Sequence, residues 1–184
     1  MTAEQAFVTA FEVPPGYGIR AHSPADDAAL LGIENRAAQL FRAHGYPEIA
    51  DNPFANVDDF RAMATGHEVL VAVTGDGMPV GYAVSGTRRD FLHLRELSVD
   101  PDHGRRGLGS AMVRAVIARC RERALRGVTL TTFRTVPFNA PFYAALGFVE
   151  LPLEQASAQL RDVFHQELPE GIAATSRVLM VHQC

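Results

Sequence analysis

The chain has 184 residues, 47% hydrophobic and 21% charged, which is the composition of a globular protein long enough to bury its own core. A formal net charge of −4 argues against a nucleic-acid partner, because binding to phosphates requires a basic face. The sequence has no apolar run near the roughly 20 residues that span a membrane, and residues 1–19 lack the pattern of a secretion signal, so we expect one soluble domain without a membrane partner.

The start of the chain predicts an arm, a strand and a capped helix. A Pro-Pro pair interrupts the first residues, so we expect a flexible arm at 1–16 and one domain at 17–184. A strand is expected at 17–21. The sequence Ser-Pro-Ala-Asp at 23–26 then has the pattern of a helix start, with serine as the N-cap and proline in the first turn.

Apolar spacing and turn residues predict the elements that follow. The first helix has an apolar residue every three or four positions until Gly45 ends it, at Leu30, Ile33, Ala37 and Leu40. A weaker helix is expected at 56–64. A Gly-Asp-Gly turn then joins two strands of a hairpin, and another strand follows; we expect these strands at 68–73, 80–84 and 91–99.

The second half predicts a strand–helix–strand unit. A long helix is expected at 107–126, with Gly127 as its stop and an apolar stripe made of Val113, Val116, Ile117, Cys120 and Ala124. The remaining expected elements are strands at 128–133, 148–151 and 177–182, a short helix at 139–146 and a polar, partly helical insertion at 152–172. This order predicts a mixed α/β fold, in which an antiparallel meander leads into a parallel strand–helix–strand unit.

The strand at 91–99 changes its alternation. Leu92 and Leu94 are followed by Leu97 and Val99, so the apolar positions shift by one residue. A shift that keeps one face apolar indicates an extra residue, a β-bulge at Arg95-Glu96. The bulge would leave backbone groups unpaired and place His93, Glu96 and Ser98 on the other face, which is either a functional face or simply solvated.

A glycine-rich turn connects this strand to the long helix. It reads Gly104-Arg105-Arg106-Gly107-Leu108-Gly109-Ser110. The N-terminus of a helix offers free N–H groups and partial positive charge, and glycines allow a close approach to a phosphate. The turn therefore favours a pyrophosphate site, although a plain helix cap with two surface arginines has the same sequence. It lacks the spacing of dinucleotide-binding and P-loop motifs.

Residues 94–109 resemble the signature of the GNAT superfamily of N-acetyltransferases, a bulged strand followed by Q/R-x-x-G-x-G/A at the start of a helix. Gly107 and Gly109 match the two small positions. Gly104 stands where glutamine or arginine is usual, and we expect Arg105 or Arg106 to supply the missing polar contact. The resemblance implies the GNAT fold: a central mixed, twisted sheet of six to seven strands with helices on both faces and a bulged fourth strand.

The same resemblance implies how acetyl-coenzyme A would bind. The backbone of Leu97 and Val99 is expected to pair with the pantetheine arm, and the Leu97 N–H to lie near the thioester carbonyl. The pyrophosphate is expected on the turn residues Arg105, Arg106, Gly107, Leu108, Gly109 and Ser110.

A second block, residues 139–148, resembles the other GNAT signature in the form N-x-P-F-Y-x-x-L-G-F. Its residues alone predict a short helix with Asn139 as N-cap, on which Tyr143 is a core residue or faces the cleft. The resemblance implies that the Tyr143 hydroxyl serves as general acid to the leaving thiol and that Asn139 contacts the cofactor. Segments 131–134 and 177–180 further resemble a bacterial subgroup with no assigned substrate.

The implied reaction is a direct attack by a primary amine on the thioester, because no serine lies in a nucleophile elbow and Cys120 falls on the apolar stripe. The amine arrives protonated and needs a base. Glu96, at the bulge, is the first choice, and His93 is the second because a histidine with an ordinary pKa near roughly 6.5 suits this work. A structural role for Glu96, in a salt bridge with Arg95 or Arg105, is the alternative.

The cysteines and histidines predict a cytoplasmic protein without a metal. Cys120 and Cys184 are the only cysteines, form no CxxC pair, and are expected to be a reduced core thiol and a reduced tail thiol. No histidine has ligand spacing to another histidine or cysteine, so we expect no zinc site.

The sequence leaves the amine, the range of acyl groups and the oligomeric state open. Residues 38–66 and the insertion are expected to select the amine, a small molecule or a peptide, and an apolar wall or plain core packing explains Phe41, Tyr46, Phe54 and Phe60 equally well. Relatives often form homodimers, which the resemblance extends to this chain. The competing functions are an inactive coenzyme A-binding regulator and a nucleotide-binding protein.

Overall fold

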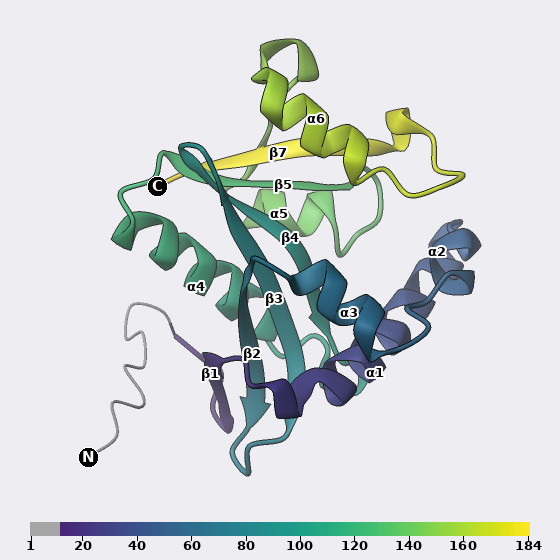
Figure 1. Cartoon of the computed structure of the whole chain (residues 1–184), viewed down its shortest axis with the longest axis vertical. Coiled ribbons are helices and arrows are strands. Elements are labelled where there is room, and N and C mark those ends of the chain that lie inside the picture. The colour runs from purple at the N-terminus through teal and green to yellow at the C-terminus, as the bar shows by residue number, and fades with distance from the viewer. Residues whose placement is uncertain (1–11) are drawn as a thin grey trace.

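The computed structural model describes residues 12–184, which form one seven-stranded sheet with helices on both faces (Figure 1). The strands are β1 Tyr17–Ala21, β2 Glu68–Thr74, β3 Pro79–Arg88, β4 Phe91–Val99, β5 Gly127–Phe133, β6 Val149–Glu150 and β7 Arg177–Gln183. The α-helices are α1 Asp27–Ala38, α2 Pro47–Asp51, α3 Val57–Ala64, α4 Leu108–Glu122, α5 Ala140–Ala145 and α6 Ala158–Gln166. The predicted mixed α/β fold is confirmed. Within 12–184, no helix is long and apolar enough to cross a membrane.

The sheet has the order β1-β2-β3-β4-β5-β7-β6. Strands β1 to β4 form an antiparallel meander, and β4 pairs with β5 in parallel, as the sequence predicts. The last strand, β7, enters between β5 and β6, so that the short β6 forms the edge. The chain therefore closes on β5 and brings its C-terminal residues to the end of α4.

Each face of the sheet has its own apolar cluster. On one face, α4 and Tyr143 of α5 pack against β3, β4 and β5 in the largest cluster. On the other face, Leu30 and Ile33 of α1 and Phe60 of α3 cover β2 and β3, while Leu160 and Phe164 of α6 pack on β7. Figure 1 shows α1 and α3 on the side of β2–β3 opposite α4, and α6 beside β7. The face that carries His93 and Ser98 is therefore covered by helices and not solvated.

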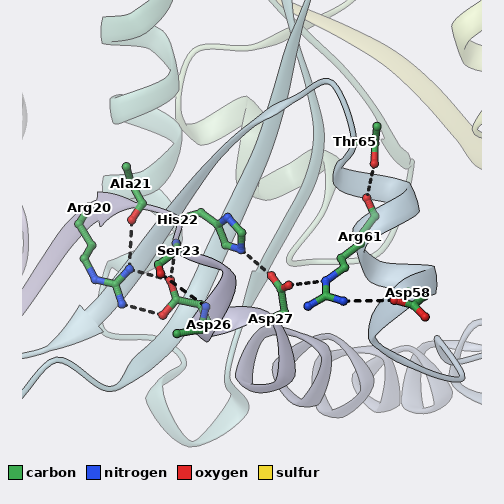
Figure 2. A network of polar contacts seen from close by, with 10 residues as sticks. Arg20, Ala21, His22, Ser23, Asp26, Asp27, Asp58, Arg61 and Thr65 are labelled. Carbon is green, nitrogen blue, oxygen red and sulfur yellow. Dashed lines mark hydrogen bonds and ion pairs between the residues drawn. The ribbon is translucent and has the colours of Figure 1, made fainter.

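A polar network fixes the start of α1 (Figure 2). Ser23 is the N-cap that the sequence predicts, on a 3-10 turn at Pro24–Asp26 that leads into α1, and it forms a reciprocal cap with Asp26: the Ser23 side chain accepts from Ala25 N–H, and Asp26 accepts from Ser23 N–H at 2.8 Å. Arg20 holds the same carboxylate with two bonds of 2.7 and 2.8 Å. The buried Asp27 lies 2.6 Å from both His22 Nε2 and Arg61 Nε, which ties α3 to α1.

Several predicted details of the two longest helices are wrong. The long helix ends at Glu122, because Ala124 takes a left-handed conformation with φ of 51° as the chain turns back into β5; Ala124 is exposed and does not belong to the apolar stripe. Gly127 is not the helix stop. It is the first residue of β5, where a side chain would overlap the carbonyl oxygen of His182 on β7. Leu40, expected in the first helix, is 44% exposed in a 3-10 turn at Gln39–His44.

The prediction of two separate reduced thiols is also wrong. Cys120 and Cys184 form a disulfide with a Cα–Cα distance of 6.4 Å. The reason is topological: β7 runs antiparallel to β5, so Gln183 pairs with Gly127 and the Cys184 N–H donates to the Arg126 carbonyl, beside the end of α4.

Of the predicted N-terminal arm, residues 1–11 lie outside the described residues. The remainder contacts the body of the protein: Val13 packs against the main apolar cluster, and Pro14 lies beside Gly107. The division of the chain between 16 and 17 stays a prediction.

Candidate active site

The fourth strand carries the predicted bulge. Along β3, Val84 pairs with Glu96 and the next residue, Ser85, pairs with Leu94, so Arg95 is the extra residue. On its other side β4 pairs with β5 only from Phe91 to His93. Beyond His93 the two strands separate. The backbone of Leu97 and Val99 therefore lies along an edge that β5 does not cover.

A cleft of about 1610 Å³ opens where β4 and β5 separate. One part of it is lined by the end of β4, the glycine-rich turn and α5. The other part is lined by α1, the turn after it, the insertion that contains α6, and the start of β7. One cavity therefore contains both the expected site of the acetyl carrier and the expected site of the acceptor amine.

The glycine-rich turn presents backbone N–H groups to the cleft. Gly107 precedes α4 with φ of 85°, a conformation that glycine adopts without strain. Leu108, Gly109 and Ser110 form the first helical turn and line the cleft. Their N–H groups have no carbonyl four residues back within the helix, so they are free to bind an anion at the positive end of the helix dipole.

The two arginines of the turn lie differently. Arg105 lines the cleft, in a left-handed conformation with φ of 58°. Arg106 does not line the cleft; its guanidinium donates to the Tyr17 hydroxyl at 2.9 Å and to the Asp102 carbonyl at 3.3 Å. Of the two, only Arg105 is positioned to compensate for glycine at position 104.

Tyr143 lies on α5 and lines the cleft while 8% exposed. Its ring packs against Phe142 and Phe148, and no hydrogen bond from its hydroxyl to a residue within 12–184 is present. Burial and the charge of Glu96 raise its pKa well above the ordinary value, and the charge of Arg177 opposes the rise. The hydroxyl is therefore a proton donor at neutral pH.

Asn139 also lines the cleft, and it occupies the N-cap position of α5 as the sequence predicts, but its side chain forms no capping hydrogen bond. Its Oδ1 accepts instead from the N–H of Phe133, 3.4 Å away at the end of β5. The side chain thus holds the turn between β5 and α5.

Glu96 lines the cleft and forms no ion pair with Arg95 or Arg105, which removes the structural alternative. Its Oε1 accepts from the N–H of Leu97 at 3.1 Å. Burial, followed by the charge of Glu34, raises its pKa to about 8, the range that suits a base at neutral pH. The amide expected to receive the thioester carbonyl is therefore occupied by the candidate base in this structure.

His93, the second candidate base, does not line the cleft. It is 1% exposed, with Nδ1 2.9 Å from Thr129 Oγ1 and Nε2 3.0 Å from Glu167 Oε1. Because both ring nitrogens are occupied, His93 positions Glu167. Glu167 does line the cleft, and it also accepts from Thr131 Oγ1 at 2.7 Å.

Sequence reasoning missed three charged residues of the cleft, Glu34, Glu167 and Arg177. Glu34 Oε2 lies 2.5 Å from the Tyr82 hydroxyl and 2.5 Å from Ser98 Oγ, so it adds negative charge beside Glu96. For these three residues, the only signal in the sequence was a polar residue that interrupts an apolar pattern. Such a signal does not say which distant elements meet.

The four aromatic residues for which the sequence left an apolar pocket wall and core packing equally open divide into two groups. Phe41 and Phe54 line the cleft. Tyr46 packs on Phe133 behind the lining, and Phe60 is a core residue against Tyr82. Within 12–184, no group of histidine, cysteine, aspartate and glutamate side chains is placed to hold a metal ion.

Comparison with known proteins gives a consistent result. The model of the "Acetyltransferase (GNAT) family" matches residues 34–148. The chain resembles a GCN5-related N-acetyltransferase from Rhodopseudomonas palustris, with a TM-score of 0.68 and 20% identity over 94% of this chain and 99% of that one. It also resembles the ribosomal-protein-S18-alanine N-acetyltransferase from Escherichia coli, with a TM-score of 0.66 and 18% identity over 91% and 93%. A PaiA N-acetyltransferase from Thermoplasma acidophilum in complex with coenzyme A has a TM-score of 0.59 and 14% identity over 91% and 99%.

Proposed function

Because the chain belongs to the GNAT family of acetyltransferases, we propose that it transfers an acetyl group from acetyl-coenzyme A to a primary amine of a small molecule or peptide by direct attack. One observation carries this proposal: a single cleft contains a bulged strand edge, an anion-binding helix start, a raised-pKa carboxyl and a buried tyrosine. These are the groups that amine acetylation needs.

The residues present fit acetyl-coenzyme A, which supplies the thioester. The N–H groups of Leu108, Gly109 and Ser110, with Arg105, would hold its pyrophosphate. The uncovered edge at Leu97 and Val99 would pair with its pantetheine arm. Asn139 would contribute indirectly, because its side chain holds the turn between β5 and α5 beside this part of the cleft. In this assignment Arg106 supports the turn through Tyr17 and Asp102.

Two side chains move the protons of the proposed reaction. The Glu96 carboxylate takes a proton from the substrate ammonium, and the freed amine forms a bond to the thioester carbon as the carbon–sulfur bond breaks. Tyr143 gives its proton to the departing thiolate. The attacking nitrogen loses its second proton as the amide forms, which restores the Tyr143 hydroxyl, and Glu96 releases its proton to solvent before the next turnover. The N–H of Leu97 stabilises the charge that develops on the carbonyl oxygen. Since Glu96 now occupies this N–H, its carboxylate must turn away when the thioester enters.

The test combines binding and turnover. Purified protein is titrated with acetyl-coenzyme A by calorimetry and then assayed for free thiol release with a broad panel of amines. We expect Tyr143→Phe to lower kcat by about 100-fold with unchanged affinity for coenzyme A, because it removes only the proton donor.

Tyr46→Phe is the matched control, since it deletes a hydroxyl from a tyrosine that does not line the cleft. Absence of acetyl-coenzyme A binding would overturn the whole proposal. Binding without turnover on any amine would favour the inactive regulator instead, and unchanged turnover in Tyr143→Phe would remove the acid role.

The wider assignments stay proposals. We propose that residues 17–184 form the acetyltransferase domain, with 1–16 as an arm, and that the protein is cytoplasmic. The disulfide between Cys120 and Cys184 is the one observation that weighs against a reducing compartment.

A further inference from the structure

The side chain of Arg177 has an unusual environment for an arginine in this protein. It lies at the first position of β7 and lines the cleft. Its guanidinium stacks over the ring of Phe133 at 4.7 Å, and Nη2 donates to Thr131 Oγ1 at 2.9 Å. Within residues 12–184, no carboxylate lies within 4.0 Å of it. A guanidinium has five N–H donors, so most of this one's capacity is unused.

Other arginines of the chain show the contrast. Arg36 and Arg61 are more than half exposed and still pair with Asp100 and Asp27. Arg134, at the neighbouring end of β5, is 47% exposed and pairs with Glu150. Arg177 is more buried than any of these, and burial lowers its pKa below the ordinary value despite nearby carboxylates. A mostly buried charge without a partner is costly, so the site is suited to an incoming anion.

The neighbouring carboxylates do not form an ion pair with the Arg177 guanidinium. Glu167 is held by His93 and Thr131, and Thr131 stands between Glu167 and Arg177 by donating to one and accepting from the other. Glu96 accepts from the Leu97 N–H. The cleft thus presents a guanidinium for an anion and, separately, carboxylates for an ammonium.

The wall around the guanidinium is apolar. Phe133 lies under Arg177, and Phe41 packs against both Phe133 and Phe138 at centroid distances of 5.2 and 5.1 Å. All three phenylalanines line the cleft. A planar fork over an aromatic ring matches the two oxygens of a carboxylate, and the phenylalanines beside it suit a hydrocarbon substituent.

Building on the proposed function, we propose that the acceptor is a zwitterionic amine of the amino-acid type. Its carboxylate pairs with Arg177, its amine faces Glu96, and its apolar side chain lies against Phe41 and Phe138.

Matched pairs of acceptors test this proposal. The probes are all standard L-amino acids, the amines that decarboxylation would give, and the amino-acid amides; phenylalanine, phenethylamine and phenylalaninamide are one set. The rates are compared per deprotonated amine. We expect kcat/KM for the best amino acid to exceed that of its decarboxylated amine by about 100-fold, because truncating one partner of a buried charge pair has an effect of this size.

Arg177→Gln supplies the second arm. We expect it to reduce the preference for the carboxylate, which is the ratio of kcat/KM for the amino acid to kcat/KM for its decarboxylated amine, to near one, mainly through the KM of the amino acid. Arg134→Gln, which removes an arginine that lies at the same end of the sheet, pairs with Glu150 and does not line the cleft, should keep the preference. Calorimetry with coenzyme A verifies that each variant is folded. Should Arg177→Gln not fold, Arg177→Lys keeps the charge without the fork, and we expect it to lose most of the preference.

The failures are distinguishable. Acetylation of simple amines with equal or better efficiency than any amino acid would overturn this inference and leave the acetyltransferase intact. A full preference for the carboxylate in both Arg177 variants would also overturn it. No thiol release with any amine would instead be a failure of the proposed function.

Discussion

Glu96 derives its chemistry from its neighbours. The bulge at Arg95 turns its side chain into the cleft, where burial and the charge of Glu34 raise its pKa to about 8. Glu34 is fixed in place by the hydroxyls of Tyr82 and Ser98. A carboxyl that would be a weak base on the surface thus becomes one matched to neutral pH.

The pH dependence of kcat/KM follows from this environment. A base with a raised pKa is protonated and inactive below that pKa, so we expect kcat/KM to rise with pH and bend near pH 8. Glu96→Gln should lower kcat/KM by about 100-fold or more and remove this bend, as measured by pH–rate profiles on any accepted amine.

The exposed Glu154 provides the control, because Glu154→Gln leaves the cleft unchanged. A bend that persists in Glu96→Gln would assign it to the amine or to another group, and Glu96 would no longer be the base.

At the scale of elements, the start of α1 depends on two buried carboxylates (Figure 2). Arg20 is the main cause that lowers the pKa of Asp26. Burial alone would raise the pKa of Asp27, but the bonds from Arg61 and His22 outweigh burial and hold it below the ordinary value. This network matters for the site because α1 carries Glu34 into the cleft.

Asp27→Asn tests this linkage. We expect the free energy of unfolding at neutral pH to fall by about 1–3 kcal/mol, because the buried carboxylate that pairs with Arg61 and bonds to His22 is replaced by a neutral amide. A carboxyl whose folded pKa is lowered stabilises the fold above its unfolded pKa, near roughly 4, and this contribution is lost as pH falls through the folded value. Thermal unfolding from pH 6 to pH 3 should therefore show the two proteins converging at acid pH. A constant difference would contradict the assignment.

At the scale of the whole molecule, β7 closes the structure. It brings Arg177 to the cleft at one end and Cys184 to the end of α4 at the other. The disulfide joins residues 64 positions apart and so restricts the unfolded chain. The C-terminal strand is thereby fixed at both the site and the opposite end of the sheet.

Cys184→Ser should lower the free energy of unfolding by about 2–4 kcal/mol in urea titrations. Reductant should lower the stability of the wild-type protein by the same amount and leave the variant unchanged. Denatured, unreduced wild-type protein should show no free thiol. Two free thiols and indifference to reductant would contradict the disulfide.

The sequence by itself determined the features that depend on residues close together in the chain. The bulge at Arg95, the glycine-rich turn at the start of α4 and the short helix α5 follow from period, capping and turn chemistry over short stretches, and the structure has these elements where they were expected. The residues alone left Tyr143 as a core or a cleft residue, and its place in the cleft was implied only by the family resemblance. Boundaries such as the end of α4 were less accurate, because the return into β5 decides where the helix stops.

Only the tertiary structure decided which distant residues meet. His93 became a support for Glu167, Glu34 joined the environment of Glu96, and Cys120 met Cys184. The physical reason is that these pairings depend on the insertion of β7 between β5 and β6 and on the packing of α1 against β3 and β4. A repeat of two or of 3.6 residues specifies which face a side chain occupies, but not which element packs against that face.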